Sequence, residues 1–104
     1  MIHQLKCEAP YFQDIIKGIK TYEVRKNDKN YDVGDYLALN EIEYVFERDA
    51  CMYKYTGNSA LYKVVHVLND NMYCKDGYVI MSIRPCMITI CGAGKAAQIL
   101  THSV

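Results

Sequence analysis

The chain lacks an excess of either charge. Its 104 residues carry 12 Lys and Arg against 12 Asp and Glu, so the formal net charge is +0. A strongly basic surface, which is the usual footprint of tight non-specific nucleic-acid binding, is therefore excluded for the molecule as a whole. Residues 31–60 are acidic and the segments on either side are mildly basic. A short basic cleft for a small anionic ligand remains compatible with this distribution.

The cysteines lack the spacing of a metal or redox site. They are Cys7, Cys51, Cys74, Cys86 and Cys91. Their number is odd and none forms a C-x-x-C pair, which argues against a zinc or thioredoxin-type site. The histidines are scattered without accompanying carboxylates at ligand spacing, so we predict no metal and no cofactor. Free thiols of this kind are typical of a cytoplasmic protein.

Long apolar segments are also missing. No run approaches the roughly 20 residues that a membrane-spanning helix needs, so no membrane partner is expected. The N-terminal segment contains Glu8 and Asp14 and has no apolar core region, so we expect no signal peptide. Hydrophobic residues make up 51% and charged residues 23% of the chain, which predicts one globular domain. Nothing in the sequence indicates an oligomer.

One amphipathic helix is predicted near the N-terminus, after a short strand over residues 2–7. Pro10 suits the first turn of a helix because its φ is fixed and its missing N–H is not needed there. Apolar side chains then recur at i, i+3, i+4 and i+7, in Phe12, Ile15, Ile16 and Ile19. Gly18 is placed to end the helix.

The segment after the helix alternates like a half-buried strand. Over residues 21–26, Tyr22 and Val24 share one face, while Glu23 and Arg25 share the other. We expect the tyrosine and valine side to be buried and the charged side to be open.

Further short strands are predicted over residues 36–40 with a continuation over 42–46, and over 51–55, 61–68 and 77–84. Thr56-Gly57-Asn58-Ser59 reads as a hairpin turn between two of them, and Pro85 as the end of the last. Residues 87–91 are a candidate extra strand and residues 93–100 a candidate short helix. The fold class is α+β: a small barrel of about five to seven mostly antiparallel strands, with one or two helices packed on it.

Three polar side chains converge where the helix meets the strand. Lys20 lies at the junction, and Glu23 and Arg25 follow on one strand face. An arginine offers a fork of donors, a glutamate accepts, and a lysine adds a mobile positive charge. A cleft at this corner would suit a polar, planar ligand. The alternative is a solvated Glu–Arg pair on an ordinary strand.

The same stretch resembles a known family. Residues 18–25 have the pattern G-x-K-T-x-E-x-R, which resembles the signature of ASCH domains, relatives of the PUA RNA-binding fold. The wider sequence is similar to the DUF3850 subgroup, found in phages and bacteria and of unknown function. Its motifs are His-x-Leu-Lys at 3–6, E-x-R-K-N-D at 23–28, Y-x-V-G-D at 31–35 and Y-T-G at 55–57. Their order and spacing together make the resemblance specific over residues 1–84.

The resemblance implies a PUA-like β-barrel over residues 1–85, with residues 86–104 as a C-terminal extension. It also implies a cleft for RNA or a modified nucleotide. The candidate ligand-binding residues are Lys20, Thr21, Glu23 and Arg25, joined by Lys6 or His3 from the first strand. His3 and Lys6 are three residues apart, so a regular strand points their side chains to opposite faces and only one of them can point inward. An exposed His3 is the simpler expectation. Asp35, after the turn at Gly34, is expected to cap backbone N–H groups.

Two other functions compete with a binding module. Some ASCH relatives are amidohydrolases acting on acetylated cytidine, with a catalytic lysine that Lys20 matches and a threonine nucleophile that Glu23 replaces. A carboxylate does not substitute for that hydroxyl, so an enzyme would need Lys20 and Glu23 as an acid–base pair instead. The second alternative is a phage or bacterial protein-interaction factor that uses the acidic side chains of Glu41, Glu43, Glu47 and Asp49.

The tyrosines are the other unusual feature. There are 10 tyrosines and no tryptophan, and such rings either fill small barrels or stack on bases. Tyr31 and Tyr55, close to predicted turns, are the candidates for base stacking. No RNP-like aromatic motif accompanies them.

Overall fold

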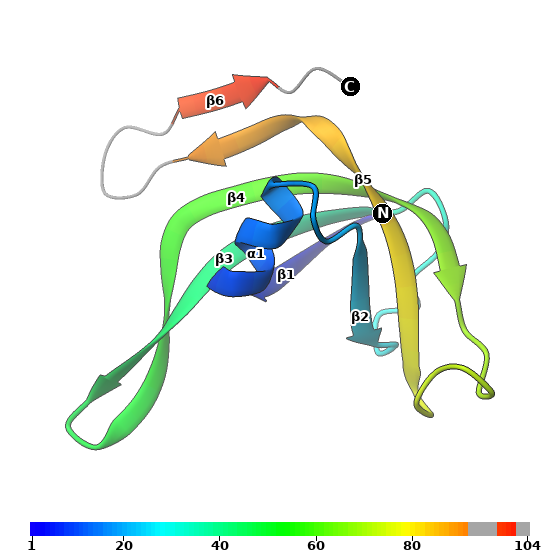
Figure 1. Ribbon diagram of the computed structural model, residues 1–104, viewed down its shortest axis with the longest axis horizontal. Helices are drawn as coiled ribbons and strands as arrows, with labels where there is room; N and C mark the ends of the chain where they lie inside the picture. The colour runs from blue at the N-terminus through cyan, green and yellow to red at the C-terminus, as the bar shows by residue number, and fades with distance from the viewer. Residues whose placement is uncertain (92–97, 102–104) are drawn as a thin grey trace.

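A computed structural model gives the fold of the protein (Figure 1). It describes the backbone of residues 1–91 and 98–101 and the side chains of residues 1–86. The elements, in chain order, are β1 (Ile2–Glu8), α1 (Ala9–Ile16), β2 (Tyr22–Lys26), β3 (Tyr36–Glu47), β4 (Ala50–Leu68), β5 (Tyr78–Cys91) and β6 (Gln98–Thr101). The predicted α+β class is confirmed, because the described residues form a sheet and one short helix.

The strands form one mixed sheet in the order β1-β3-β4-β5-β2, and β6 pairs with β5. The β1–β3 pair is parallel and the other pairs are antiparallel. Among the described residues, β1 and β2 are the two ends of this path, so the pairings do not close it into the expected barrel. Figure 1 shows that β4 and β5 arch over α1, which leaves a concave side on the sheet.

Helix α1 is terminated by Gly18, as the sequence predicts, but the apolar periodicity continues beyond the helix to Ile19. Gly18 adopts φ +76°, and its N–H donates to the Ile15 carbonyl at 3.0 Å, while the N–H of Ile19 donates to the Asp14 carbonyl at 2.9 Å. These two bonds form the Schellman motif that a glycine in the left-handed region allows. Phe12 and Ile15 are buried as predicted. The prediction for Ile19 was wrong: it lies beyond the helix end and is 71% exposed.

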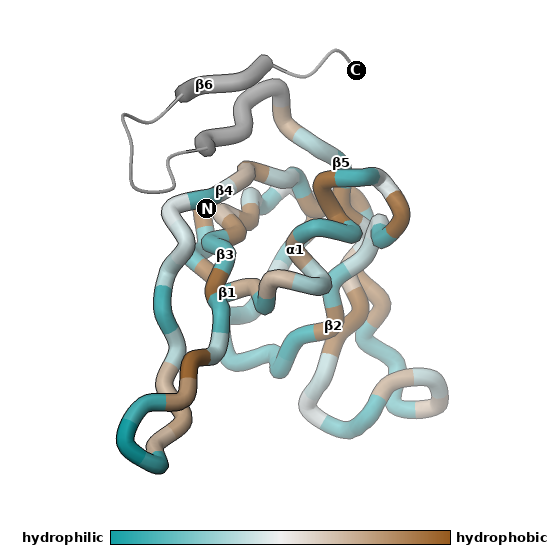
Figure 2. Tube along the Cα trace, turned by 60° about the vertical axis from the view of Figure 1, so that its left-hand side comes forward, coloured by the Kyte–Doolittle hydropathy of each residue, from teal (hydrophilic) through white to brown (hydrophobic). Residues whose placement is uncertain are grey.

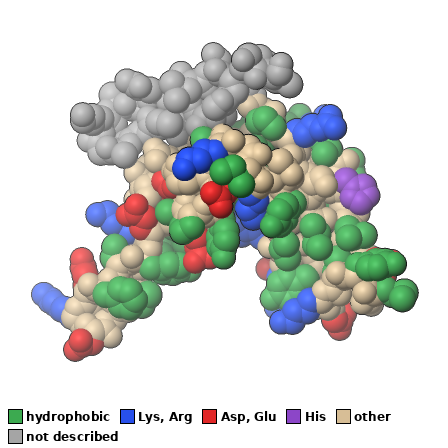
Figure 3. Space-filling model, viewed as in Figure 1, with side chains coloured by type: hydrophobic (Ala, Val, Ile, Leu, Met, Phe, Trp, Pro, Cys, Tyr) green, Lys and Arg blue, Asp and Glu red, His purple; other side chains and the backbone are tan. Residues whose placement is uncertain are grey.

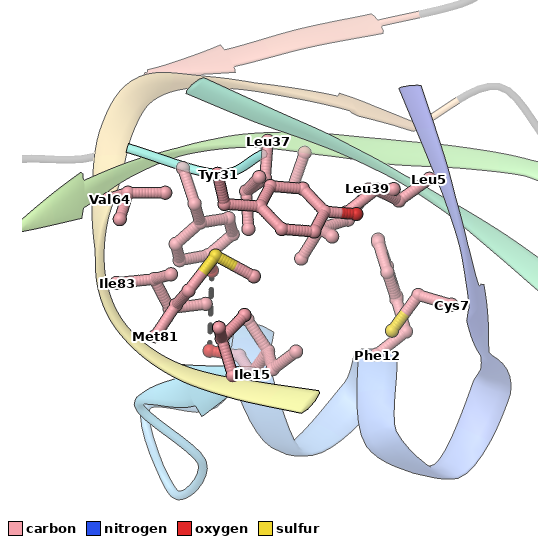
Figure 4. Packing of buried hydrophobic residues seen from close by; sticks show 13 residues of the cluster. Leu5, Cys7, Phe12, Ile15, Tyr31, Leu37, Leu39, Val64, Met81 and Ile83 are labelled. Atoms are coloured by element: carbon pink, nitrogen blue, oxygen red, sulfur yellow. Dashed lines mark hydrogen bonds between the residues drawn. The ribbon is translucent and has the colours of Figure 1, made fainter. Parts of the chain in front are cut away.

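The core lies between α1 and the concave side of the sheet (Figure 4). The helix, β1, β3, β4, β5 and the loop before β3 contribute to it through Leu5, Cys7, Phe12, Ile15, Tyr31, Leu37, Leu39, Ala60, Tyr62, Val64, Val79, Met81 and Ile83. The Tyr62 hydroxyl donates to the Ile15 carbonyl at 3.3 Å, which ties the last turn of α1 to β4. Burial alternates along β1, because His3, Leu5 and Cys7 are buried while the residues between them are exposed.

Strand β4 corrects the predicted hairpin at residues 56–59. It runs unbroken for 19 residues, and the turn into it lies at Arg48 and Asp49, which both have positive φ. Two successive residues with positive φ match the tight turns that join antiparallel strands. Gly57 instead has φ +93° at an irregularity in the β3–β4 register, between the pairs Asn40–Ser59 and Ile42–Tyr55. Gly57 therefore marks a β-bulge and not the predicted turn.

Strand β5 also continues where the sequence predicted an end. Pro85 lies within it, opposite Tyr62 and next to a shift in the β4–β5 register. An irregular position tolerates a proline because no ladder hydrogen bond is needed from its nitrogen. Residues 87–91, predicted as a separate strand, are the continuation of β5. Of the predicted helix over 93–100, residues 98–100 belong to β6, and residues 93–97 lie outside the described part of the chain.

Candidate functional site

A cavity of about 660 Å³ opens on the concave side, between β1, β2 and the outer part of the β3–β4 hairpin. Its lining residues are Lys6, Cys7 and Glu8 of β1, Tyr11 of α1, Lys20 before β2, Tyr22, Glu23, Val24 and Arg25 of β2, Ile42 and Tyr44 of β3, and Tyr53 of β4. Figure 3 shows the molecule hollowed between the hairpin and the β2 side, with charged side chains of both signs at the head of the hollow.

A buried carboxylate holds two cations at this cavity. Glu23 is 3% exposed. Its Oε1 accepts a hydrogen bond from Lys20 Nζ at 2.8 Å, and its Oε2 accepts one from Arg25 Nε at 2.8 Å. Both carboxylate oxygens are therefore bound by positive charges, as a buried carboxylate requires. The convergence of Lys20, Glu23 and Arg25 inferred from the sequence is present in the structure.

The orientation of β2 is the reverse of the predicted one. Glu23 points inward, whereas Tyr22 and Val24 are 47% and 50% exposed. A hydrophobicity pattern places the apolar residues inside, but here the two cations offset the cost of burying the carboxylate. The predicted open charged face was therefore wrong for Glu23, and Arg25 is only partly exposed.

Arg25 also joins the two edges of the sheet. Its Nη2 donates to the backbone carbonyl of Lys6 in β1 at 2.8 Å. Lys29, just after β2, reaches β1 in the same way, with Nζ 3.3 Å from the Gln4 carbonyl. Among the described residues, β1 and β2 are not paired as strands, and these two side chains bridge them instead.

Each lysine of the cavity lies over a tyrosine ring. Lys20 Nζ is 4.7 Å from the ring centroid of Tyr22 and 5.9 Å from that of Tyr11. Lys6 Nζ is 4.3 Å from the centroid of Tyr53, and contact with Tyr53 raises the pKa of Lys6 above its usual value. Such cation–π contacts keep a flexible ammonium close to a flat aromatic surface.

The cavity thiol is not a nucleophile. Cys7 is buried in the wall, and desolvation raises its pKa to about 12, with the Glu23 carboxylate adding to the effect. A thiol rather than a thiolate is therefore present at neutral pH, and a thiol is a poor nucleophile and a poor metal ligand.

Two of the predicted ligand-binding residues do not line the cavity. Thr21 is exposed and lies outside its wall. His3 points away into the sheet, where its Nε2 lies 2.8 Å from Asp35 Oδ2 and its ring meets that of Tyr31 edge-on at 4.8 Å. The prediction of an exposed His3 was wrong, because the imidazole bonds to Asp35 and packs on Tyr31. Lys6, of opposite parity, does line the cavity.

Asp35 has the capping role that the sequence predicts. Its Oδ2 accepts a hydrogen bond from the Asp32 N–H at 3.1 Å as well as bonding to His3. The hydrogen bond with His3 lowers the pKa of Asp35 below its usual value, and the Asp32 N–H contributes to the shift.

We expect Asp35→Asn to lower the free energy of unfolding by about 1–2 kcal/mol at neutral pH, because hydrogen bonds to the charged carboxylate are lost. A lowered pKa in the folded state means that the carboxylate stabilises the fold above the ordinary aspartate pKa, near pH 4, and ceases to do so as the pH falls through the folded-state value. Urea unfolding of both proteins between pH 7 and pH 2 should therefore converge at the acid end. A constant difference over this range would contradict the assignment.

The acidic middle of the chain is not a single surface patch. Glu41 is buried, and its oxygens accept from Gln13 Nε2 at 2.8 Å, Thr56 Oγ1 at 2.7 Å and Asn58 Nδ2 at 3.0 Å. The bulge of β4 at Gly57 thus wraps around this carboxylate. Glu41 therefore cannot belong to the predicted interaction surface. The other three acidic residues, Glu43, Glu47 and Asp49, are exposed near the end of the hairpin.

Sequence reasoning missed the aromatic part of the site. Tyr11, Tyr44 and Tyr53 line the cavity from three different elements, whereas the two tyrosines singled out for stacking do not: Tyr31 is buried and Tyr55 lies outside the wall. The abundance of tyrosine was the available signal. Tyr44 and Tyr53 come together through the pairing of β3 with β4, and Tyr11 lines the same cavity from α1.

Within the part of the chain that the structure describes, no three His, Cys, Asp or Glu side chains are grouped so that they would hold a metal ion. Among these same residues, no helix has the length and apolar character needed to cross a membrane.

The fold and the site define a small mixed-sheet protein with one helix and a tyrosine-rimmed cavity that holds a Lys–Glu–Arg cluster. The chain belongs to the family described as Domain of unknown function (DUF3850), whose family model matches residues 2–83. It is also similar to the "Uncharacterized 12.9 kDa protein in GpA 3'region" of Escherichia phage P2, at 48% identity over 40 residues. That match covers 38% of this chain and 37% of the phage protein, so the chain spans about a third of the relative's length.

Proposed function

We propose that the cavity binds a nucleotide, either free or as part of an RNA strand. The observation that carries the proposal is the pairing of cations with aromatic rings in one cavity: Lys20 over Tyr22, and Lys6 over Tyr53. A nucleotide combines an anionic phosphate with a flat base. Lysine and arginine bind the first, and tyrosine rings stack on the second.

The net charge of the cavity agrees with such a ligand. Lys6, Lys20 and Arg25 face Glu8 and Glu23 in its wall, which leaves a small positive excess. Since the chain as a whole is neutral, this local excess would attract a short anionic ligand more than a long duplex. In this proposal Glu23 positions the two cations and does not itself contact the phosphate.

We also infer that the fold is of the ASCH or PUA-like type and that the protein works in the cytoplasm. Support for the first inference is that Lys20, Glu23 and Arg25 of the G-x-K-T-x-E-x-R pattern meet at one cavity. The second rests on the free thiols, among which Cys51 is exposed.

A hydrolase is less well supported than a binding module. Lys20 and Glu23 are paired at 2.8 Å, which is the distance that a proton-transferring pair needs. Both oxygens of Glu23 are bound by cations, however, and Thr21 does not line the cavity. Incubation with acetylated cytidine, followed by mass spectrometry for released acetate, separates the two functions, because a binding module leaves the ligand unchanged.

Lys20→Ala should weaken nucleotide binding about tenfold or more, because a charge-assisted hydrogen bond to phosphate is lost. The measurement is an NMR titration of the full chain with the four nucleoside monophosphates at 50 mM and 200 mM salt. Binding by the wild type should fall as salt rises. Binding by Lys20→Ala should depend less on salt than binding by the wild type, because one cation no longer contacts the phosphate.

Lys17→Ala is the matched control, since Lys17 is exposed in the same segment and does not line the cavity. It should titrate like the wild type. Equal binding by Lys20→Ala and wild type would refute the cavity assignment. Silence of the wild type across all four nucleotides and short RNAs would favour the protein-interaction factor instead.

A further inference from the structure

The outer part of the β3–β4 hairpin, residues 43–55, projects from the sheet, and we name it the arm (Figure 1). We propose that the arm extends the nucleotide cavity into a track for single-stranded RNA, so that the ligand is a strand of several nucleotides. This inference rests on the proposed function of the cavity.

The strand register puts the aromatic residues of the arm on one side. Tyr44 pairs with Tyr53, and Phe46 pairs with Cys51. Residues directly opposite each other share a face, and so do residues two apart on one strand. Tyr55 therefore joins the same side, and its ring meets that of Tyr53 edge-on at 5.8 Å. We call Tyr44, Phe46, Tyr53 and Tyr55 the aromatic face.

The charged residues of the two paired arm strands lie on the opposite side. There Glu43 pairs with Lys54, Val45 with Met52, and Glu47 with Ala50. The aromatic face consequently carries no carboxylate of the arm strands that would repel a phosphate. Along the backbone, Figure 2 shows a hydrophilic tip of the arm with hydrophobic residues directly behind it.

The aromatic face is accessible. Phe46 is 81% exposed, and each of the three tyrosines is about half exposed. Strand β1 pairs with β3 only as far as Ile42, and β5 pairs with β4 only from Ser59 onward. Within the described residues, the arm strands therefore pair only with each other. An exposed row of four large rings is unusual on a protein surface unless it binds something.

The aromatic face is continuous with the cavity. Tyr44 and Tyr53 belong to both, and Lys6 stands over Tyr53 where the two meet. A strand whose phosphate contacts Lys6, Lys20 and Arg25 would thus lead its next bases onto rings along the arm. Stacking on aromatic rings tolerates any base, which is how proteins bind single strands without reading them. A duplex would keep its base faces hidden from these rings.

The test is a length series of oligoadenylates, from the mononucleotide to the tetranucleotide, titrated against the full chain by calorimetry. In the wild type, affinity should rise with length, by about fivefold or more for each base that stacks. Phe46→Ala should lose the step of about fivefold or more that belongs to the base stacked on this ring. Met52→Ala is the matched control, because Met52 is a similarly large exposed residue on the opposite side of the arm. It should keep the gain.

The outcomes separate the two proposals. If the mononucleotide binds but the tetranucleotide binds no better, the track is refuted and the cavity function stands. If no member of the series binds, the proposed function itself fails. If sedimentation shows self-association that Phe46→Ala removes, and no length gain is seen, the aromatic face is a protein contact and the track is refuted.

Discussion

Replacing Phe12 by alanine should lower the free energy of unfolding by about 3–5 kcal/mol. Phe12 is 2% exposed and belongs to the core cluster between α1 and the sheet. The helix has eight residues, which is too short to be stable by itself, so its position depends on this packing. A loss of this size is a large fraction of the roughly 5–15 kcal/mol that stabilises a domain. Urea unfolding followed by circular dichroism measures it.

Tyr11 provides the control for this prediction, because it is the adjacent residue on the same helix and is exposed at the cavity wall. Tyr11→Ala should change stability by less than about 0.5 kcal/mol, as exposed substitutions generally do. If Phe12→Ala does not fold, Phe12→Leu should still show a loss of about 1–1.5 kcal/mol. Equal stability of Phe12→Ala and the wild type would mean that α1 does not pack as described.

In helix α1, the apolar periodicity predicts the helix and its buried face, but not the point at which the buried face ends. Pro10, Phe12, Ile15 and Gly18 each have the role that their spacing predicts. Ile19 fits the same period and yet is exposed. Gly18, two residues after the last helical residue, turns the chain away from the helix axis. The apolar periodicity does not predict this turn, because the φ of Gly18 depends on its capping hydrogen bonds.

The error at β4 has a different physical cause. Thr56-Gly57-Asn58-Ser59 has the composition of a turn, and glycine does adopt positive φ there. What the sequence does not give is the partner: Thr56 and Asn58 donate to the buried Glu41 across the sheet. A local signal for a bend is the same whether the chain reverses or bulges, and only the long-range carboxylate decides between them.

The candidate site was predictable in part. The charged cluster lies within six residues of chain, so local spacing brings it together. Its buried orientation was not predictable, because alternation favours burial of Tyr22 and Val24 over Glu23. The tyrosines of the opposite wall come from α1, β3 and β4, and no spacing rule relates them to β2. Their position depends on the sheet order and on the bridging of the two edges by Arg25.

Glu23→Gln should lower the free energy of unfolding by roughly 2–4 kcal/mol, because breaking a buried ion cluster leaves its other charges without compensation. The side chains of Lys20 and Arg25 are only 15% and 24% exposed, so water replaces the lost carboxylate incompletely. A glutamine oxygen can accept from one cation, but its amide then faces the other. Chemical unfolding of the variant at neutral pH gives the value.

Glu8→Gln is the matched control, since Glu8 also lines the cavity but is exposed. It should leave stability within about 0.5 kcal/mol of the wild type. A double-mutant cycle of Glu23→Gln with Lys20→Met should give a coupling energy of about 1–3 kcal/mol, as expected for residues in direct contact. A coupling near zero would show that the pair does not form in solution.

The same variant distinguishes the two possible roles of Glu23. If Glu23 positions the cations, Glu23→Gln weakens nucleotide binding, because Lys20 and Arg25 must then be ordered at the expense of binding energy. Removal of a negative charge acts in the opposite direction, so the weakening should be smaller than that of Lys20→Ala. If Glu23 were instead a general base, binding would persist and only turnover would disappear. Weakened binding with no turnover in either protein identifies a positioning carboxylate in a binding module.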